Sequence, residues 1–213
     1  MGPMDGACRG RGNPFYFLMN KKDHLMFAPS RLVRRGFVIP GLFLCLFSLA
    51  EASPITEADV NAAQQAWCDG LVKISQTAKE GGDAKAVTGQ VIDDLYDYQE
   101  GVVFFKPTLA SGKNTFRPTR AGALAYFVGG NKDFPEDTGF ALKDWVKVRY
   151  DNNAAEKGMQ IHGDIAITMG NVYLTNAKGE EVMVDKTFVF RRCKDGKLRL
   201  CVHKSALPFD PKK

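Results

Sequence analysis

Histidine is scarce in this chain, which has three histidines among its 213 residues. His24 lies in an N-terminal segment that we expect to be removed, so His162 and His203 remain. A catalytic zinc usually takes three protein ligands and keeps a fourth position open. A three-histidine site therefore cannot be built from one mature chain, and no Cys-x-x-Cys or His-Glu-x-x-His spacing replaces it. The sequence predicts no metal ligands, although a mixed site of histidine, cysteine and aspartate stays open.

An excess of positive charge is also missing once the N-terminal segment is set aside. The whole chain has a formal net charge of +5, but residues 1–52 hold seven Lys and Arg against three Asp and Glu. The remainder has 22 basic and 21 acidic residues. A protein that neutralises nucleic-acid phosphates needs clustered Lys and Arg. The nearly neutral remainder therefore argues against nucleic-acid binding.

A secretory signal peptide is predicted near the N-terminus. Residues 31–35 are basic, residues 36–49 form an apolar run too short to span a bilayer comfortably, and residues 50–52 form a small-x-small cleavage signal. We expect cleavage before Ser53 and export to the periplasm or the medium, with no membrane attachment afterwards. A retained anchor is the alternative. The patternless segment before Met26 also suggests Met26 as the true start.

Cysteine use leaves two alternatives open. Cys68, Cys193 and Cys201 remain after cleavage, in a compartment that is oxidising. Because three is an odd number, the mature chain has either one disulfide and one leftover thiol or three free cysteines.

Three helices are expected in the first half of the mature chain. Thr56 is a capping residue before acidic residues, and apolar residues then recur at helical spacing as far as Lys79. Gly81-Gly82 ends this helix. A second helix is predicted over residues 83–98 and a short third one over residues 119–127.

Strands separated by turns are expected elsewhere. The predicted strands are Val102–Thr108, Trp145–Tyr150, Gln160–Thr175, Glu181–Cys193 and Lys197–Ala206. Asp195-Gly196 predicts a two-residue type I′ hairpin, which needs positive φ at both positions. Helices followed by antiparallel strands predict a single α+β domain over residues 53–213, cone-shaped, with the helices packed on the concave face of a long curled sheet and a pocket between them.

The predicted strand around Ile165–Leu174 is apolar on both faces. Ile165, Ile167, Met169 and Tyr173 point to one face of the strand. Ala166 and Val172 point to the other. Because a sheet with two apolar faces needs two covers, we expect helices on one side and a second copy of the chain on the other, giving a homodimer. Folding of the C-terminal tail over this face is the alternative.

The last strand carries the residues best suited to chemistry. His203 and Ser205 are two apart, so both project to one face of the strand together with Cys201 and Arg199. An imidazole can move protons near neutral pH, and a hydroxyl can hold water or a small oxyanion. An ordinary structural histidine is the alternative.

Other polar residues have ordinary interpretations beside functional ones. Lys106 could place a cation near a bound anion, and Thr108 and Tyr126 offer neutral hydroxyls, but each also suits plain packing or solvation. Asp94 and Asp97 could act as bases if they were desolvated in a pocket.

Several short segments spread over nearly all of Glu57 to Phe209 match one known family. They are Leu95-Tyr96-Asp97-Tyr98, Phe105-Lys106-Pro107-Thr108, Phe116-Arg117-Pro118-Thr119, Tyr126-Phe127-Val128-Gly129, Glu136-Asp137-Thr138-Gly139-Phe140-Ala141, Trp145-Val146-Lys147-Val148-Arg149 and Met169-Gly170-Asn171. With these segments the chain resembles the iota-class carbonic anhydrases, whose domain is similar to the association domain of the calcium/calmodulin-dependent kinase and to the nuclear transport factor superfamily. The resemblance implies reversible hydration of carbon dioxide to bicarbonate. Family members use zinc, manganese or no metal, and the low histidine count favours no cofactor.

The resemblance also implies site residues. The family's His-His-Ser-Ser segment corresponds to His203-Lys204-Ser205-Ala206, and the family's threonine and tyrosine correspond to Thr108 and Tyr126. Thr108, Tyr126 and Ser205 would hold the water and the bicarbonate, and His203 would carry the proton. We expect His203 and Ser205 to face inward, because burying the Lys204 ammonium would be costly. A non-catalytic dimeric module that binds a small ligand or mediates assembly is the alternative function.

Overall fold

The structure is a computed structural model, and it describes residues 53–155 and 157–211. The predicted signal peptide and Met26 lie outside these residues. The helices are α1 (Glu57–Lys79), α2 (Ala84–Leu95) and α3 (Arg120–Val128), with short 3₁₀ turns η1 (Gly112–Asn114), η2 (Phe140–Leu142) and η3 (Asn152–Ala155). The strands are β1 (Phe104–Lys106), β2 (Trp145–Asp151), β3 (Met159–His162), β4 (Ile165–Asn176), β5 (Glu181–Arg192) and β6 (Leu198–Ala206).

The first helix begins at the predicted cap, Thr56, and the third begins one residue later than predicted. Thr56 and Asp59 form a reciprocal capping box at the start of α1, and Thr119 caps α3 through the amide of Gly122. The prediction for the second helix was too long, because α2 ends at Leu95. Tyr96 is in extended conformation and forms a parallel bridge with Leu200 of β6, so the chain joins the sheet where the sequence pattern suggested a further helical turn.

The sheet has the order β1-β6-β5-β4-β2, with β3 paired to β4. All pairs are antiparallel except β1 with β6, which is parallel. The single strand predicted over Gln160–Thr175 is in fact two strands, because a turn with Gly163 at a φ of 62° lies between β3 and β4. The predicted strand Val102–Thr108 is shortened to β1.

The turn between β5 and β6 differs from the prediction. Gly196 has a positive φ of 81°, but Asp195 does not, so the turn is not type I′. The Gly196 amide donates to the Cys193 carbonyl, and the Cys193 amide donates to the Lys197 carbonyl. This pattern is typical of a three-residue loop, in which a type I turn is followed by a glycine in the left-handed region.

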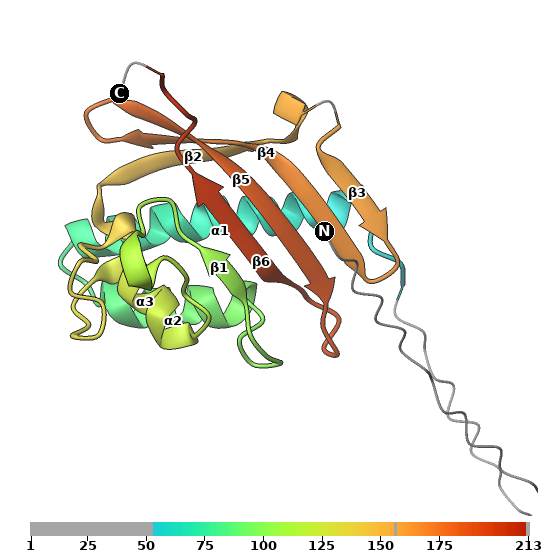
Figure 1. Cartoon of the computed structure of the whole chain (residues 1–213), viewed down its shortest axis with the longest axis horizontal. Coiled ribbons are helices and arrows are strands. Elements are labelled where there is room, and N and C mark those ends of the chain that lie inside the picture. The colour runs from blue at the N-terminus through green and yellow to red at the C-terminus, as the bar shows by residue number, and fades with distance from the viewer. Residues whose placement is uncertain (1–52, 156, 212–213) are drawn as a thin grey trace, which may run out of the picture. The chain divides into compact units, whose positions relative to one another are not determined.

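The helices pack on one face of the curled sheet, which is the predicted cone-shaped α+β arrangement. Figure 1 shows α1 running across β4, β5 and β6, with α2 and α3 gathered beside β1 at one end of the sheet. Side chains of both layers fill the core between them, including Trp67 and Leu71 of α1, Leu174 of β4 and Phe188 of β5. No described helix is long and apolar enough to cross a membrane.

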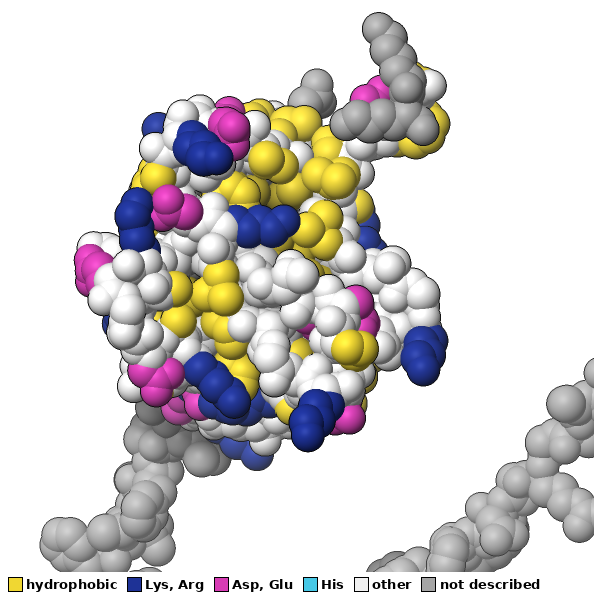
Figure 2. Space-filling view, turned by 90° about the vertical axis from the view of Figure 1, so that its left-hand side faces the viewer, with side chains coloured by type: hydrophobic (Ala, Val, Ile, Leu, Met, Phe, Trp, Pro, Cys, Tyr) yellow, Lys and Arg dark blue, Asp and Glu magenta, His cyan; other side chains and the backbone are white. Residues whose placement is uncertain are grey.

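The other face of the sheet is uncovered. Ala166, Thr168 and Gly170 of β4 face the helices and are buried, whereas Ile167 and Met169 point away and are 36% and 56% exposed. This confirms the predicted alternation. Figure 2 views the molecule from the left-hand side of Figure 1 and not onto this face, and there hydrophobic side chains gather in the upper part, with charged side chains scattered among and around them.

Candidate active site

An irregularity in β6 decides which of its side chains face the helices. The pairing of β5 with β6 shifts register between Val189 and Phe190, so that Phe190 lies opposite Leu200 and Val189 opposite Val202. Cys201 is the extra residue, as in a β-bulge. Leu200 is therefore buried on the inner face, whereas regular alternation predicted Cys201 and Arg199 on the face of His203 and Ser205.

Beyond this bulge the predicted orientation is confirmed. His203 is 2% exposed and Ser205 is fully buried, whereas Lys204 is exposed and pairs with Asp185. The ammonium of Lys204 therefore stays in solvent, which avoids the cost of desolvating it.

The His203 imidazole is enclosed by aromatic rings and has a contact at each nitrogen. The Phe105 ring stacks on it with the centroids 4.4 Å apart, and the Phe188 ring meets it edge-on at 4.7 Å. Nδ1 lies 2.8 Å from the Tyr96 hydroxyl, and Nε2 lies 3.0 Å from Lys186 Nζ. Since protein groups occupy both nitrogens, the imidazole does not face the solvent as a free proton carrier would.

The Tyr96 hydroxyl extends this chain of contacts into α1. It accepts a hydrogen bond of 2.9 Å from the Trp67 indole, which can only donate. Tyr96 is 1% exposed, and this burial raises its pKa well above the usual range. The tyrosine therefore stays neutral and serves to fix the imidazole plane.

Two hydroxyls from different strand ends meet at Ser205. Ser205 Oγ lies 2.7 Å from Thr108 Oγ1, and Thr108 follows Pro107 directly after β1. The parallel pairing of β1 with β6 brings these residues together, since Lys106 is aligned with Lys204. Thr108 is only half-buried, so it connects the buried serine to the molecular surface.

The predicted tyrosine of α3 lies near this pair. Tyr126 is 5% exposed, and its hydroxyl is buried without a hydrogen-bond partner among the described residues. Burial raises the pKa of Tyr126 to about 12, and the nearby Thr108 hydroxyl opposes that increase in part. A buried donor without a partner is costly, so a ligand that accepts from Tyr126 would stabilise the site.

Lys106 has a different position from the one expected. Its Nζ donates to the backbone carbonyl of Ser205 over 3.0 Å instead of facing the hydroxyls. Lys106 is partly exposed, and desolvation lowers its pKa. The lysine thus ties β1 to β6 and contributes positive charge at the edge of the site.

Lys186 of β5 is a site residue that the sequence analysis missed. Its Nζ lies 3.0 Å from His203 Nε2 and 3.2 Å from Ser205 Oγ, and it lies 4.5 Å from the centroid of the Trp67 ring. Lys186 is 2% exposed, and burial lowers its pKa to about 7. The available signal was the alternation of β5, where Lys186 occupies an inward position between the apolar Val184 and Phe188.

Other candidate residues have structural roles. Asp97 is buried but pairs with Arg191, and Asp94 is exposed beside Lys197, so neither faces the hydroxyl pair. Arg117 is fully buried against Asp137.

Neither histidine supports a metal centre near the hydroxyls. His162 is exposed on β3, and both nitrogens of His203 are already in contact with protein groups. Within the described part of the chain, Asp97, Glu100 and Cys193 are close enough together to hold an ion, but Arg191 already pairs with Asp97. Cys68, Cys193 and Cys201 are all free in the structure.

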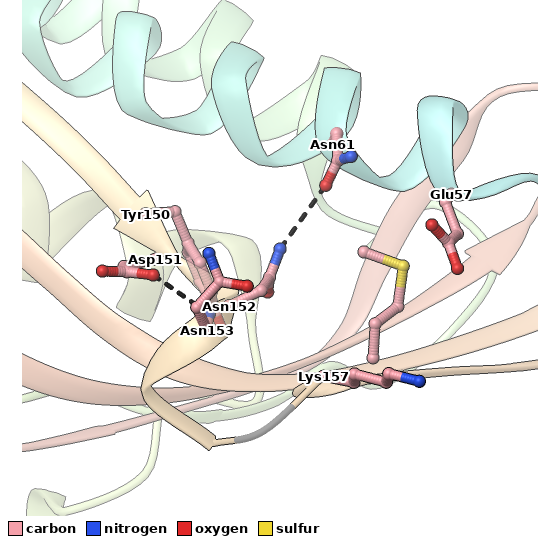
Figure 3. Close-up of a pocket in the computed structure, with 8 residues that line it drawn as sticks. Glu57, Asn61, Tyr150, Asp151, Asn152, Asn153 and Lys157 are labelled. Atoms are coloured by element: carbon pink, nitrogen blue, oxygen red, sulfur yellow. Dashed lines mark hydrogen bonds between the residues drawn. The ribbon is translucent and has the colours of Figure 1, made fainter.

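A surface pocket lies elsewhere and is polar. Figure 3 shows it between the start of α1 and the link from β2 to β3, with a volume of about 490 Å³. Asn152 donates to Asn61 across it, and Asn153 donates its amide to Asp151. These contacts brace η3 against α1 and bring no nucleophile or base together with an open hydroxyl.

The fold and the enclosed hydroxyls define a class of protein. It is an α+β cone whose core contains a small site lined by aromatic rings, neutral hydroxyls and one lysine. Such a site suits a small, uncharged molecule that gains negative charge, because hydroxyl donors stabilise an oxyanion strongly where water is excluded.

The comparisons identify the family. A family model described as metal-independent carbonic anhydrase matches residues 58–207. The chain is 54% identical over 158 residues to the metal-independent carbonic anhydrase of Nostoc sp. (strain PCC 7120 / SAG 25.82 / UTEX 2576), and the match covers 73% of this chain and 75% of that protein. The chain therefore belongs to the metal-independent carbonic anhydrase family.

A solved structure supports the same assignment. The crystal structure of a cyanobacterial iota-carbonic anhydrase complexed with bicarbonate has a TM-score of 0.71 and 53% sequence identity, and the match covers 74% of this chain and 94% of that chain. The family resemblance and the cone fold inferred from the sequence are confirmed. The family's description also agrees with the prediction that no metal cofactor is needed.

We predict that Tyr96→Phe destabilises the protein by about 1–3 kcal/mol, because the change leaves the Trp67 indole without its acceptor and His203 Nδ1 without its partner in a buried setting. Urea unfolding followed by circular dichroism measures the loss. Tyr173→Phe on the uncovered face of β4 is the matched control and should change stability by less than about 0.5 kcal/mol. Equal stability of the two variants would contradict this role for Tyr96.

Proposed function

We propose that the protein catalyses the reversible hydration of carbon dioxide to bicarbonate without a metal ion. Family membership and the bicarbonate complex of the cyanobacterial relative support this activity. The observation that carries the proposal is that three neutral hydroxyls, those of Ser205, Thr108 and Tyr126, lie close together, and that the Tyr126 hydroxyl has no hydrogen-bond partner among the described residues.

The apolar walls of the site suit carbon dioxide. Phe105, Phe188 and Trp67 surround the imidazole and exclude water from it. Carbon dioxide is linear and apolar, so leaving water for such a region costs it little free energy. A charged solute would lose much more through desolvation.

The hydroxyls act when charge develops. As the oxygen of water bonds to the carbon, one oxygen of carbon dioxide becomes negative. Fixed donors at the place where this charge appears stabilise the transition state more than the substrate. Tyr126 has a hydroxyl hydrogen to offer, and the Ser205–Thr108 pair can orient the attacking water or one bicarbonate oxygen.

His203 acts indirectly in this reaction, by holding a neighbouring side chain in place. Burial and the neighbouring Lys186 lower the pKa of His203 well below its usual value, so the imidazole stays neutral. A proton from the pocket can reach His203 only through Tyr96 or Lys186, because these two groups occupy its nitrogens. Its direct task is to hold Lys186 beside Ser205.

We predict that Ser205→Ala lowers the turnover number for hydration by about 10²-fold or more, because the change removes the hydroxyl that positions the attacking water. Stopped-flow measurement with a pH indicator gives the rate. Thr175→Ala, a hydroxyl removal near the end of β4, is the control and should leave turnover unchanged.

Chelation separates the metal-free reaction from a zinc reaction. The wild-type rate should survive exhaustive dialysis against a chelator. Loss of activity on chelation with recovery on adding zinc would contradict the proposal, as would full activity of Ser205→Ala. An inactive wild type would favour a non-catalytic binding module.

We also propose that the mature chain is a homodimer joined through the uncovered face of the sheet. The register aligns four apolar side chains in one row across four strands: Phe104, Val202, Val189 and Ile167. Phe104 is 70% exposed and the neighbouring Met169 is 56% exposed. An apolar patch of this kind is typical of an interface, and the same patch on a second copy is its natural cover.

We predict that Phe104→Glu converts the dimer to a monomer, because it places a charge of the same sign from each copy in the interface. Light scattering at micromolar concentration distinguishes the two masses. Val146→Glu is the control, since Val146 is 52% exposed but lies beside α1 and not in the row. A wild-type monomer at this concentration would refute the dimer.

We propose, finally, that the protein is exported and cut before Ser53, on the strength of the basic, apolar and small-residue segments over residues 31–52. The chain purified from the periplasm or medium should begin at Ser53 in N-terminal sequencing. Ala52→Lys should block the cut by removing the small residue at the cleavage site, whereas Ser53→Ala should not. Retention of the uncut chain in the membrane fraction would show that the segment is an anchor.

A further inference from the structure

Lys186 is a buried lysine without an acidic partner. Its neighbour Asp185 points to the other side of β5 and pairs there with Lys204. No ion pair joins Lys186 to a carboxylate among the described residues. A structural lysine in a core is normally paired, because an isolated buried ammonium is expensive. A lysine in this setting gives up its proton readily, which makes it a candidate for chemistry.

Three close neighbours of Lys186 Nζ accommodate both of its protonation states. They are His203 Nε2, Ser205 Oγ and the face of the Trp67 ring. An ammonium donates one hydrogen to each of them. A free amine donates to two and needs one donor for its lone pair, which the Ser205 hydroxyl supplies by turning its hydrogen toward Nζ. The change of state therefore needs only rotation of one hydroxyl.

Resting on the proposed function, we infer that Lys186 accepts the proton that hydration of carbon dioxide releases, with Ser205 as the relay. Water attacks the carbon of carbon dioxide, so that an O–C bond forms while one C=O electron pair moves onto oxygen. The proton of the attacking water passes to Ser205 Oγ as the Ser205 hydroxyl proton passes to Lys186 Nζ. The products are bicarbonate and the Lys186 ammonium, so atoms and charge balance.

The proton then has a way out. Ser205 Oγ lies 2.7 Å from Thr108 Oγ1, and Thr108 is half-buried at the end of β1. After bicarbonate leaves, the ammonium can return its proton through Ser205 and Thr108 to water or buffer. In the dehydration direction the same ammonium protonates the hydroxyl of bicarbonate, as microscopic reversibility requires.

The surroundings of Lys186 set its titration. Burial is the main cause that lowers its pKa to about 7, and the negative charge of Asp185 opposes this. The polar and titratable groups that face its side chain are Trp67 and Cys68 of α1 and His203 and Ser205 of β6, while Tyr96 contacts His203 and Tyr150 donates to the Lys186 backbone carbonyl. Burial raises the pKa of Cys68 and of Tyr150 to about 12, so both stay neutral around pH 7.

The pH dependence follows from these states. Hydration needs the free amine, so its kcat/KM should rise as pH increases through the pKa of Lys186, about 7. Dehydration needs the ammonium, so its kcat/KM should fall over the same range. His203 does not contribute a step near neutral pH, because its pKa is well below the usual value.

The test compares Lys186→Met with Lys178→Met in the full mature protein. Lys178 is exposed in the turn between β4 and β5 and serves as the control. We expect Lys186→Met to lower the hydration kcat by about 10²–10⁴-fold, the usual contribution of a general base, with KM changed less than threefold, and to lose the step near pH 7. Lys178→Met should keep both rate and profile.

Two further measurements separate proton transfer from a structural role. In Lys186→Ala, small primary amines added to the solution should restore part of the rate, because the space left by the side chain admits an amine. In the wild type, nuclear magnetic resonance of isotope-labelled lysine should show one lysine that titrates near pH 7, absent in Lys186→Met.

The outcomes are distinguishable. An active wild type whose Lys186→Met variant keeps the rate and the pH step, or whose lysines all titrate above pH 9, would overturn this inference and leave the proposed function intact. A wild type without hydration activity would overturn the proposed function and the inference with it.

Discussion

The pairing of β5 with β6 is the interaction on which the site depends. Strand geometry sends alternate side chains to opposite faces, and the bulge at Cys201 resets that alternation once. The reset places Leu200 in the core and still leaves His203 and Ser205 on the inner face, opposite Phe188 and Lys186. Without the bulge, burial of Leu200 would send His203 to the solvent face, because one residue of slip exchanges the two faces of a strand.

A second constraint is the low polarity of the space that these strands enclose. Four aromatic rings surround the His203 imidazole, and they remove the water that would otherwise hold Lys186 and His203 in their charged forms. Burial therefore lowers the pKa of Lys186 and the pKa of His203. The site thus gains a lysine with a pKa of about 7 and an imidazole that stays neutral, which together allow proton transfer close to physiological pH.

The Trp67 indole in α1 helps to fix the geometry of the hydrogen-bonded chain that leads to Lys186. The Trp67 indole can only donate, so the Tyr96 oxygen must accept from it. Tyr96 then fixes the plane of His203, and His203 fixes the position of Lys186. These contacts link α1, through Tyr96 after α2, to β5 and β6. The helical layer is therefore part of the site and does more than cover the core.

Several features could be predicted from the sequence because they depend on local chemistry. The capping box at Thr56 and the apolar spacing after it define α1, and the alternation in β4 defines a sheet with one uncovered face. The inward orientation of His203 and Ser205 followed from the cost of burying Lys204. The end of α2 and the turn at Asp195 were predicted wrongly, because Tyr96 is held by Leu200 of β6 and the turn takes a third residue.

The sequence by itself determined the fold class and the scarcity of metal ligands, since these follow from periodicity and composition, and its family resemblance named the hydroxyl residues that we propose for the site. Only the tertiary structure decided the place of Lys186. The alternation in β5 places Lys186 on the inner face. A lysine at an inner position, however, usually indicates that the strand has been assigned wrongly. Whether a lysine can be buried depends on what surrounds Nζ, and those groups, Trp67, His203 and Ser205, come from α1 and β6, far apart in the chain.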